Sequence, residues 1–385
     1  MKKVKIFVAA LAAAVVAISF AACGEKCATG HSYGEWTVTV AATCTEDGTE
    51  TRKCSVCDKE ETRPIAKLGH DYGDPVYAER DGKLVTVRKC SRCDVEDVKE
   101  VENGVAVRTW DELATAVKTN NAYIVLMNDI AKVGANDLGL RPYGADHSIT
   151  IDLNGKTIAS RISARTAWDG VKDCGFNLTV KILNGNVGTA DGYVADVKDA
   201  ANVIAYAIMI NGGRVNLTIE KVNMIGYYGG FYTNGSNAGS TVRMSDCKIK
   251  GANADSGASY LAGGHTVTFD RCAFDGNFGL YIKSGTVTLN DCAVRATGAY
   301  EQPNYNGNGA DGGGSGIVVD SVKGYTPSLI FVMNRGSIVS ANGYAFEQVV
   351  TKGDNYSTST LDGVSMIAGK DPNVFVTTEG AVTVR

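Results

Sequence analysis

The stretch from residue 217 to residue 296 repeats one short pattern four times, and this repetition constrains the fold more than any other feature. The copies are LTIEKVNMIG at 217–226, VRMSDCKIKG at 242–251, VTFDRCAFDG at 267–276 and VTLNDCAVRA at 287–296. They begin 25, 25 and 20 residues apart. A period in this range is typical of a stacked fold, in which each repeat buries its apolar face against its neighbours.

Apolar residues occupy three matching columns in the four copies. The columns are Ile219, Met244, Phe269 and Leu289; Val222, Cys247, Cys272 and Cys292; and Met224, Ile249, Phe274 and Val294. Alternation with period 2 predicts strands with one buried face, and the change of parity between the first and second columns predicts a bend between two short strands. The cysteine column predicts an interior ladder of buried thiols, with a disulfide between neighbouring coils as the alternative.

A further strand precedes the repeated pattern, at 205–212, 278–285, 315–321 and 343–350. Short strands that return every 20–25 residues describe the coils of a parallel β-helix. Here the chain resembles the right-handed parallel β-helix of the pectate-lyase-like superfamily, over about residues 104–385. The resemblance implies an all-β solenoid, but one scaffold hosts many functions. A later unit at 329–331 aligns with residues 287–289.

The segment before the repeats and the charged column within them also have structural interpretations. Residues 109–112 (TWDE) form a capping box before an apolar run, which predicts a short helix that covers the open end of the β-helix. The outward positions Lys221, Asp246, Arg271 and Asp291 alternate in sign. This alternation predicts ion pairs between stacked coils rather than catalytic carboxylates.

The first 22 residues have the pattern of an export signal. Three lysines at positions 2, 3 and 5 precede an apolar run at 6–20. Residues 20–23 (FAAC) resemble a bacterial lipobox, which implies that Cys23 is lipidated and that residues 23–30 form the attachment point and linker. Ordinary signal cleavage is the alternative. We therefore expect an exported protein that is anchored by lipid to the membrane at the bacterial cell surface.

Residues 31–100 carry a second, unrelated repeat. GHSYG at 30–34 returns as GHDYG at 69–73, and RKCSVC at 52–57 returns as RKCSRC at 88–93. The pattern resembles the short Cys-rich repeats found near the N-termini of surface proteins of Firmicutes. Two CxxC motifs with histidine and cysteine nearby match the ligands of a tetrahedral zinc site. Because so small a segment has little apolar core, we expect it to need such a site to stabilise its fold. Disulfides are the alternative in an exported protein.

The candidate zinc ligands are divided unequally between the two Cys-rich repeats. They are His31, Cys44, Cys54, Cys57, His70, Cys90 and Cys93. The first repeat is the richer, with His31, Cys44, Cys54 and Cys57 followed by His70, so we expect about one zinc ion, held mainly by Cys54 and Cys57. The second repeat has Ala78 where Cys44 would align, so its site is either incomplete or borrows a ligand.

Long excursions at 165–175, 188–202 and 297–314 interrupt the coils, and loops on a rigid scaffold often carry function. Aromatic residues there and at a nearby turn suit sugar rings, which present apolar faces and hydroxyls. The candidate ligand-binding residues are Trp168, Tyr227, Tyr228, Tyr232, Tyr300 and Tyr305. The alternative is that these aromatic side chains only pack the loops against the β-helix. Asn306, Asn308 and Asp311 resemble a calcium-binding loop, which makes Ca²⁺ a second candidate cofactor.

Enzyme motifs of the resembling superfamily are incomplete in this chain. Pectate lyases of this superfamily use an Arg-rich motif, but here Arg141-Pro142 lacks the second arginine, since Ala145 stands in its place. Polygalacturonases use paired aspartates and a Gly-His-Gly motif, but no Asp-Asp pair occurs here and residues 263–265 read GGH. The net charge of −4 does not suggest nucleic-acid binding. The sequence thus predicts a non-enzymatic β-helix that binds a glycan or a host or cell-wall ligand, with no catalytic residue assigned. A polysaccharide lyase or glycoside hydrolase is the first alternative, and a structural spacer is the second.

Overall fold

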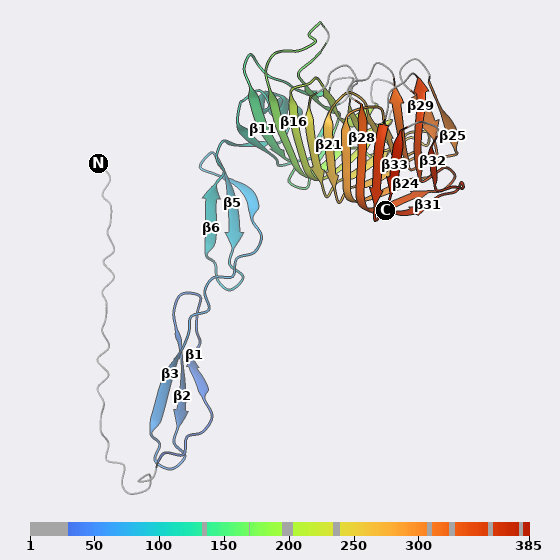
Figure 1. The fold of residues 1–385 in the computed structure, drawn as a ribbon. Helices are drawn as coiled ribbons and strands as arrows, with labels where there is room; N and C mark the ends of the chain where they lie inside the picture. Colours follow the sequence, from blue (N-terminus) through green and yellow to red (C-terminus); the bar gives the residue numbers. More distant parts are fainter. Residues whose placement is uncertain are drawn as a thin grey trace. The chain divides into compact units, whose positions relative to one another are not determined.

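The structure is a computed structural model that describes residues 30–132, 137–168, 170–194, 203–233, 239–305, 310–322, 328–352, 357–376 and 380–385 (Figure 1). The segment predicted to be an export signal and the predicted lipidation site Cys23 lie outside the described residues. The chain divides into two compact units. One comprises Met1–Val76 with Val87–Val98, and the other comprises Tyr77–Thr86 with Lys99–Arg385.

The second unit is built around two long sheets of parallel strands, drawn from green to red in Figure 1. One sheet has nine strands among the described residues: β10 (Leu138–Leu140), β13 (Ile162–Arg165), β15 (Tyr206–Asn211), β17 (Gly229–Thr233), β20 (Ser259–Leu261), β23 (Leu280–Ile282), β27 (Ile317–Val322), β29 (Phe346–Lys352) and β32 (Val374–Val376). Four of them, β15, β23, β27 and β29, correspond to the strands that the sequence places before the repeated pattern.

The other sheet has sixteen strands in the described part of the chain. The main path runs through β7 (Gly104–Val107), β8 (Ala122–Leu126), β11 (His147–Asp152), β14 (Leu178–Gly188), β16 (Val215–Gly226), β18 (Thr241–Ser245), β21 (Thr266–Asp270), β24 (Thr286–Ala296), β28 (Leu329–Ser340), β30 (Ser357–Asp362) and β33 (Ala381–Val384). Beside it lie β9 (Ile130–Ala131), β12 (Thr157–Ala159), β19 (Lys248–Gly251), β22 (Ala273–Gly276) and β31 (Ser365–Ile367).

The strand register confirms the predicted columns. Ile219 pairs with Met244, Met244 with Phe269, and Phe269 with Leu289. One alignment was wrong by two residues, because Phe331 rather than Leu329 pairs with Val287. A two-residue slip keeps the same face inward, so alternation alone leaves it undetermined.

The cysteine column faces the interior, as predicted. Cys247, Cys272 and Cys292 are each 1% exposed, carry free thiols and belong to the continuous apolar core of the β-helix. Each thiol lies near backbone carbonyl oxygens, such as that of Asp270, which is 3.5 Å from the Cys272 sulfur. The ladder therefore packs as small apolar side chains with weak S–H donors.

The predicted bend is a left-handed backbone position that recurs from coil to coil. The φ angles are 56° at Lys221, 55° at Asp246, 53° at Arg271 and 52° at Asp291. Such a φ is uncommon outside glycine, so packing of the flanking strands must hold it. The charged side chains at these bends pair between coils as expected, with Arg271 2.8 Å from Asp246.

The predicted capping helix is present as α1 (Trp110–Ala116). The Thr109 side chain accepts from the Glu112 N–H, and the Glu112 carboxylate accepts from the Thr109 N–H at 3.2 Å. Leu113 is fully buried against the core that β7 and β8 begin. The helix thus covers apolar side chains at the first coils.

The first Cys-rich repeat forms a three-stranded antiparallel sheet of β1 (Thr37–Val40), β2 (Gly48–Lys53) and β3 (Glu60–Ile65). The second repeat contributes the three-stranded sheet of β4 (Val76–Arg80), β5 (Lys83–Lys89) and β6 (Glu96–Glu100). Among the described residues, no helix has the length and apolar character needed to cross a membrane.

Candidate functional site

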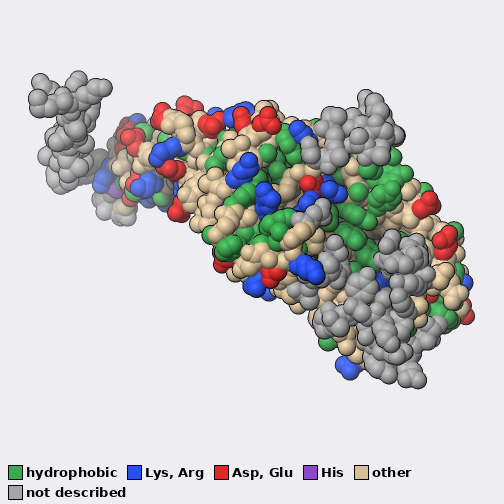
Figure 2. Space-filling view, turned by 90° about the horizontal axis from the view of Figure 1, so that it is seen from above, with side chains coloured by type: hydrophobic (Ala, Val, Ile, Leu, Met, Phe, Trp, Pro, Cys, Tyr) green, Lys and Arg blue, Asp and Glu red, His purple; other side chains and the backbone are tan. Residues whose placement is uncertain are grey.

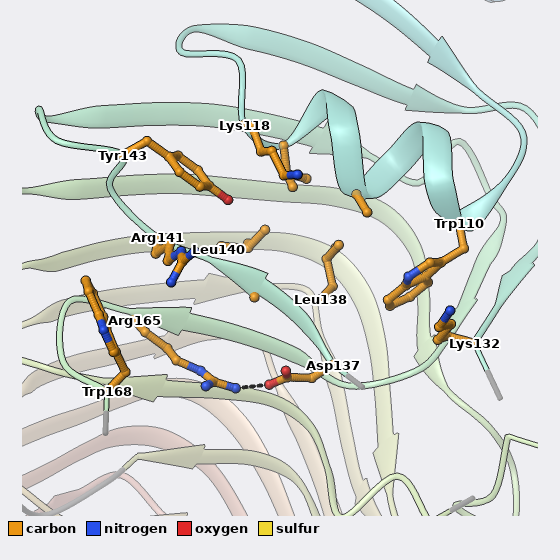
Figure 3. A pocket seen from close by; sticks show the side chains of 13 residues that line it. Trp110, Lys118, Lys132, Asp137, Leu138, Leu140, Arg141, Tyr143, Arg165 and Trp168 are labelled. Carbon is orange, nitrogen blue, oxygen red and sulfur yellow. Dashed lines mark hydrogen bonds and ion pairs between the residues drawn. The ribbon is translucent and has the colours of Figure 1, made fainter. Parts of the chain in front are cut away.

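A pocket of about 390 Å³ lies between α1 and the first strands of the nine-stranded sheet (Figure 3). Its walls come from α1, from β10 and the loop that follows it, and from the end of β13 with the turn after it. The volume falls in the range of small-molecule sites. The pocket belongs entirely to the second unit.

The described residues that line this pocket carry a strong excess of positive charge. Lys118, Lys132, Arg141 and Arg165 line it, against the single carboxylate of Asp137. These charges come from four separate segments that the coils bring together. Since the whole chain has a net charge of −4, the pocket is a local cationic site on an acidic protein.

The negative charge of Asp137 is already balanced by neighbouring arginines. Arg165 and the Ser163 hydroxyl donate to its carboxylate, and the Arg161 Nε lies 3.3 Å away. Burial alone would raise the pKa of Asp137, but these three donors hold it below its usual range. The Arg165 Nε atom is buried without a hydrogen-bond partner among the described residues. This N–H is a donor available to a bound acceptor.

Two tryptophans stand at different walls of the pocket, Trp110 at the start of α1 and Trp168 after β13 (Figure 3). The guanidinium of Arg141 lies 5.6 Å from the ring centres of both Trp168 and Tyr143. The Lys132 ammonium lies 5.9 Å from the Trp110 ring. Flat apolar rings next to cations suit a ligand that is partly apolar and negatively charged.

Of the predicted ligand-binding residues whose side chains the structure describes, only Trp168 lines this pocket. Tyr232 was expected at a turn, but it lies within β17, on the face opposite the buried Phe231. Its ring stacks on Tyr206 at 4.3 Å and on Tyr260 at 5.5 Å, with interplanar angles of 19° and 15°. Because both faces of the Tyr232 ring are covered, it offers no platform for a sugar.

The tyrosines at the neighbouring turn remain more open. Tyr227 and Tyr228 meet edge to face at 4.9 Å, and Tyr228 is 52% exposed. Figure 2 shows that hydrophobic side chains also gather in the middle of one face of the molecule, with Lys and Arg side chains beside them. Tyr228 is therefore a surface aromatic residue away from the cationic pocket.

Tyr300 fastens a hairpin rather than forming an open platform. It precedes β25 (Glu301–Tyr305), which pairs with β26 (Ala310–Gly313). Its hydroxyl donates to Glu347 at 3.1 Å, and Lys370 lies 3.7 Å from its ring centre. The Tyr305 side chain, the Asp311 side chain and residues 306–309 lie outside the described part, and so does the predicted calcium loop.

A buried ion pair lies farther along the nine-stranded sheet. Lys283 and Asp320 are 2.5 Å apart, and both side chains are 0% exposed. Asp320 also accepts from the Tyr281 hydroxyl at 3.0 Å and from the Thr351 backbone N–H at 2.9 Å. Such complete satisfaction of a buried carboxylate is characteristic of a structural network.

The cysteine and histidine side chains of the first unit form two clusters that could hold a metal such as zinc. In each cluster the ligand atoms lie within 4.8 Å of one another: one contains Cys44, His70, Cys90 and Cys93, and the other contains His31, Cys54 and Cys57. Among the described residues, no disulfide joins these cysteines to one another. The predicted grouping of Cys44 and His70 with the first repeat was wrong, because both side chains lie with the CxxC motif of the second repeat.

The thiols in these clusters differ in acidity. Burial opposes ionisation of Cys90, but N–H groups of Arg92 and Asp71 donate to its sulfur and lower its pKa to about 6. Burial and the neighbouring thiols raise the pKa of Cys44 to about 11. A divalent cation bound by the cluster would offset the repulsion between neighbouring thiolates and displace the protons that remain on the thiols.

Sequence reasoning missed most of the pocket. Trp110 was recognised only as part of a helix start, and Arg141 only as part of an incomplete enzyme motif. Lys118, Lys132 and Arg165 carry no local signal at all, because they come together only through the stacking of coils.

Comparison with known families supports the fold. Residues 196–362 match the family model described as the right handed beta helix region. Together with the parallel register on both sheets, this match identifies the second unit as a right-handed parallel β-helix. The fold accommodates many activities, so the fold alone does not identify the function of this protein.

Proposed function

We propose that this protein is an exported, lipid-anchored surface protein whose β-helix binds a negatively charged glycan of a host or cell-wall surface. The supporting observation is the pocket of about 390 Å³, which is lined by four cationic side chains, two tryptophans and one carboxylate. The charge of that carboxylate is balanced by its ion pair with Arg165. A sugar ring packs its apolar face on Trp168 or Trp110, while its acidic group pairs with Arg141 and the lysines.

The charge state of Asp137 favours binding over hydrolysis. Glycoside hydrolysis ordinarily needs two carboxyl groups, one of them protonated to act as an acid. Asp137 is the one carboxylate among the described residues that line the pocket, and its arginine and serine neighbours lower its pKa. A glycoside hydrolase remains a competing proposal, and it requires a carboxyl pair that the described lining of this pocket does not supply. A polysaccharide lyase is the other competing proposal; it needs a base rather than two carboxyl groups, so the assay for cleavage has to separate it from binding.

A glycan array probed with the full chain tests the proposal, with a reducing-sugar assay on the same ligands in parallel. We expect retention on saccharides that carry carboxylate or phosphate groups, no retention on neutral ones and no release of reducing ends. Release of reducing ends from any retained polysaccharide would support the enzyme instead. Retention that ignores charge would contradict the role given to the pocket.

The lipid anchor has its own test. Replacing Cys23 by serine removes the thiol that lipidation requires, so the variant should appear in the medium or accumulate unprocessed, whereas the native chain stays in the membrane fraction. Cell fractionation and immunoblotting measure the difference. Unchanged membrane retention of Cys23→Ser would remove the lipoprotein proposal and leave the pocket argument intact.

A further inference from the structure

A loop of the first Cys-rich repeat is tied to the start of the second. The loop spans residues 43–47, between β1 and β2. The N–H of Leu68 donates to the Thr43 carbonyl at 2.8 Å, and the N–H of Lys67 donates to the Asp47 carboxylate at 2.7 Å. Residues 67 and 68 belong to the connection between the repeats, so the loop lies against that connection.

The same loop carries Cys44 into the ligand cluster of the second repeat. The Cys44 sulfur lies 3.8 Å from the Cys90 sulfur, and the Cys93 sulfur lies 3.3 Å from the His70 Nδ1 atom. Around a tetrahedral Zn²⁺ with Zn–S bonds of about 2.3 Å, two sulfurs are about 3.8 Å apart. A disulfide would instead bring its sulfurs to about 2.05 Å. The spacing fits a metal site and is too long for a disulfide.

The first repeat has almost no other core. Among its residues, 30–66, the buried apolar side chains are those of Cys44 and Cys54. The strand β1 is exposed along its whole length. A segment of this size without an apolar core needs a covalent or metal link to fold. The side chains that could supply this link are the metal-ligating ones.

We propose that a Zn²⁺ ion bound by Cys44, His70, Cys90 and Cys93 joins the two Cys-rich repeats to each other. The metal is therefore a link between repeats, and the second repeat completes its site with a ligand from the first. Three thiolates and one imidazole form a closed structural site without an open position for catalysis. The link is independent of the function proposed for the pocket.

The second cluster is a matched internal control. In the described part of the chain, His31, Cys54 and Cys57 supply three ligands, and the Lys59 ammonium lies 3.3 Å from the His31 Nε2 atom. A set of three ligands beside a cation holds Zn²⁺ less tightly than a closed set of four. We expect the first equivalent of zinc to enter the four-ligand cluster.

Zinc content and affinity of the full chain test this assignment, measured by competition with a chromophoric chelator. The native chain and Cys57→Ser should each retain one tightly bound zinc. Cys44→Ser should bind it weaker by at least about 100-fold, since even changes outside the ligand shell cost 10- to 100-fold. Cys44→His, which keeps a ligand, should recover most of the affinity. With Co²⁺ as probe, charge-transfer absorption should fall in Cys44→Ser and not in Cys57→Ser.

Trypsin provides a readout of the link itself. Lys67 is exposed in the connection between the repeats. Cleavage there should be slow in the zinc-loaded native chain and in Cys57→Ser, and fast in Cys44→Ser or after EDTA. Tight zinc binding that survives Cys44→Ser but not Cys57→Ser would overturn the proposal. Disulfide-bonded, metal-free protein by non-reducing mass spectrometry would overturn it too.

Discussion

Replacing Lys283 by methionine should lower the free energy of unfolding of the β-helix by about 3–5 kcal/mol, because it leaves a buried carboxylate without its cation. Lys283 and Asp320 are both 0% exposed and 2.5 Å apart. The Tyr281 hydroxyl and the Thr351 backbone N–H still donate to Asp320, but they do not neutralise it. Urea unfolding followed by circular dichroism measures the loss.

An exposed ion pair of the same fold gives the matched control. Arg271 and Asp246 are 2.8 Å apart, and their side chains are 59% and 39% exposed. Solvent screens such pairs, so Arg271→Met should destabilise the fold far less than Lys283→Met. If Lys283→Met is no more damaging than Arg271→Met, the network around Asp320 is not the buried ionic cluster described above.

Removing the aromatic and cationic groups of the pocket should abolish measurable glycan binding without unfolding the protein. Loss of one aromatic platform or one charge-assisted hydrogen bond costs about 1–3 kcal/mol, which is roughly 10- to 100-fold in affinity. We therefore expect Trp168→Ala and Arg141→Ala each to weaken retention by that factor, with the melting temperature nearly unchanged. Raising the salt concentration should weaken native binding as well.

Two further variants locate the binding surface. Arg243 is an exposed cation in β18, away from the pocket, so Arg243→Ala should leave affinity unchanged. Tyr228, the exposed tyrosine of the neighbouring turn, is not part of the pocket, so Tyr228→Ala should also bind normally. A binding defect in Tyr228→Ala with normal binding by Trp168→Ala would move the site to the turn tyrosines.

Most of the β-helix could be predicted from the sequence because its signal is local and repeated. The Cys247, Cys272 and Cys292 column recurs at a fixed place in each repeat, and each member is buried. The register of β28 was missed by two residues, since a long excursion precedes it and alternation cannot distinguish slips that keep the same face inward.

The sites were harder to predict because their residues meet only through tertiary structure. Spacing shows that Cys44 is a candidate ligand, but it does not show which repeat the loop reaches. The pocket joins α1 to β10 and β13, and no periodic signal links Lys118 with Arg165. Tyr232 was a misleading candidate, since an aromatic residue in sequence gives no indication that its neighbours in adjacent coils cover both faces.

Isothermal titration with a uronic-acid oligosaccharide and with its carboxyl-reduced counterpart tests the central claim most directly, because the reduction replaces each carboxylate by an uncharged hydroxymethyl group and leaves the rest of the sugar unchanged. If the pocket of Trp110, Arg141 and Trp168 binds an anionic glycan, the native chain should bind the acidic form and lose at least about 10-fold in affinity for the reduced form. Arg141→Ala should erase that difference. Equal affinity of the native chain for both forms, or a preference for the neutral one, would contradict the account.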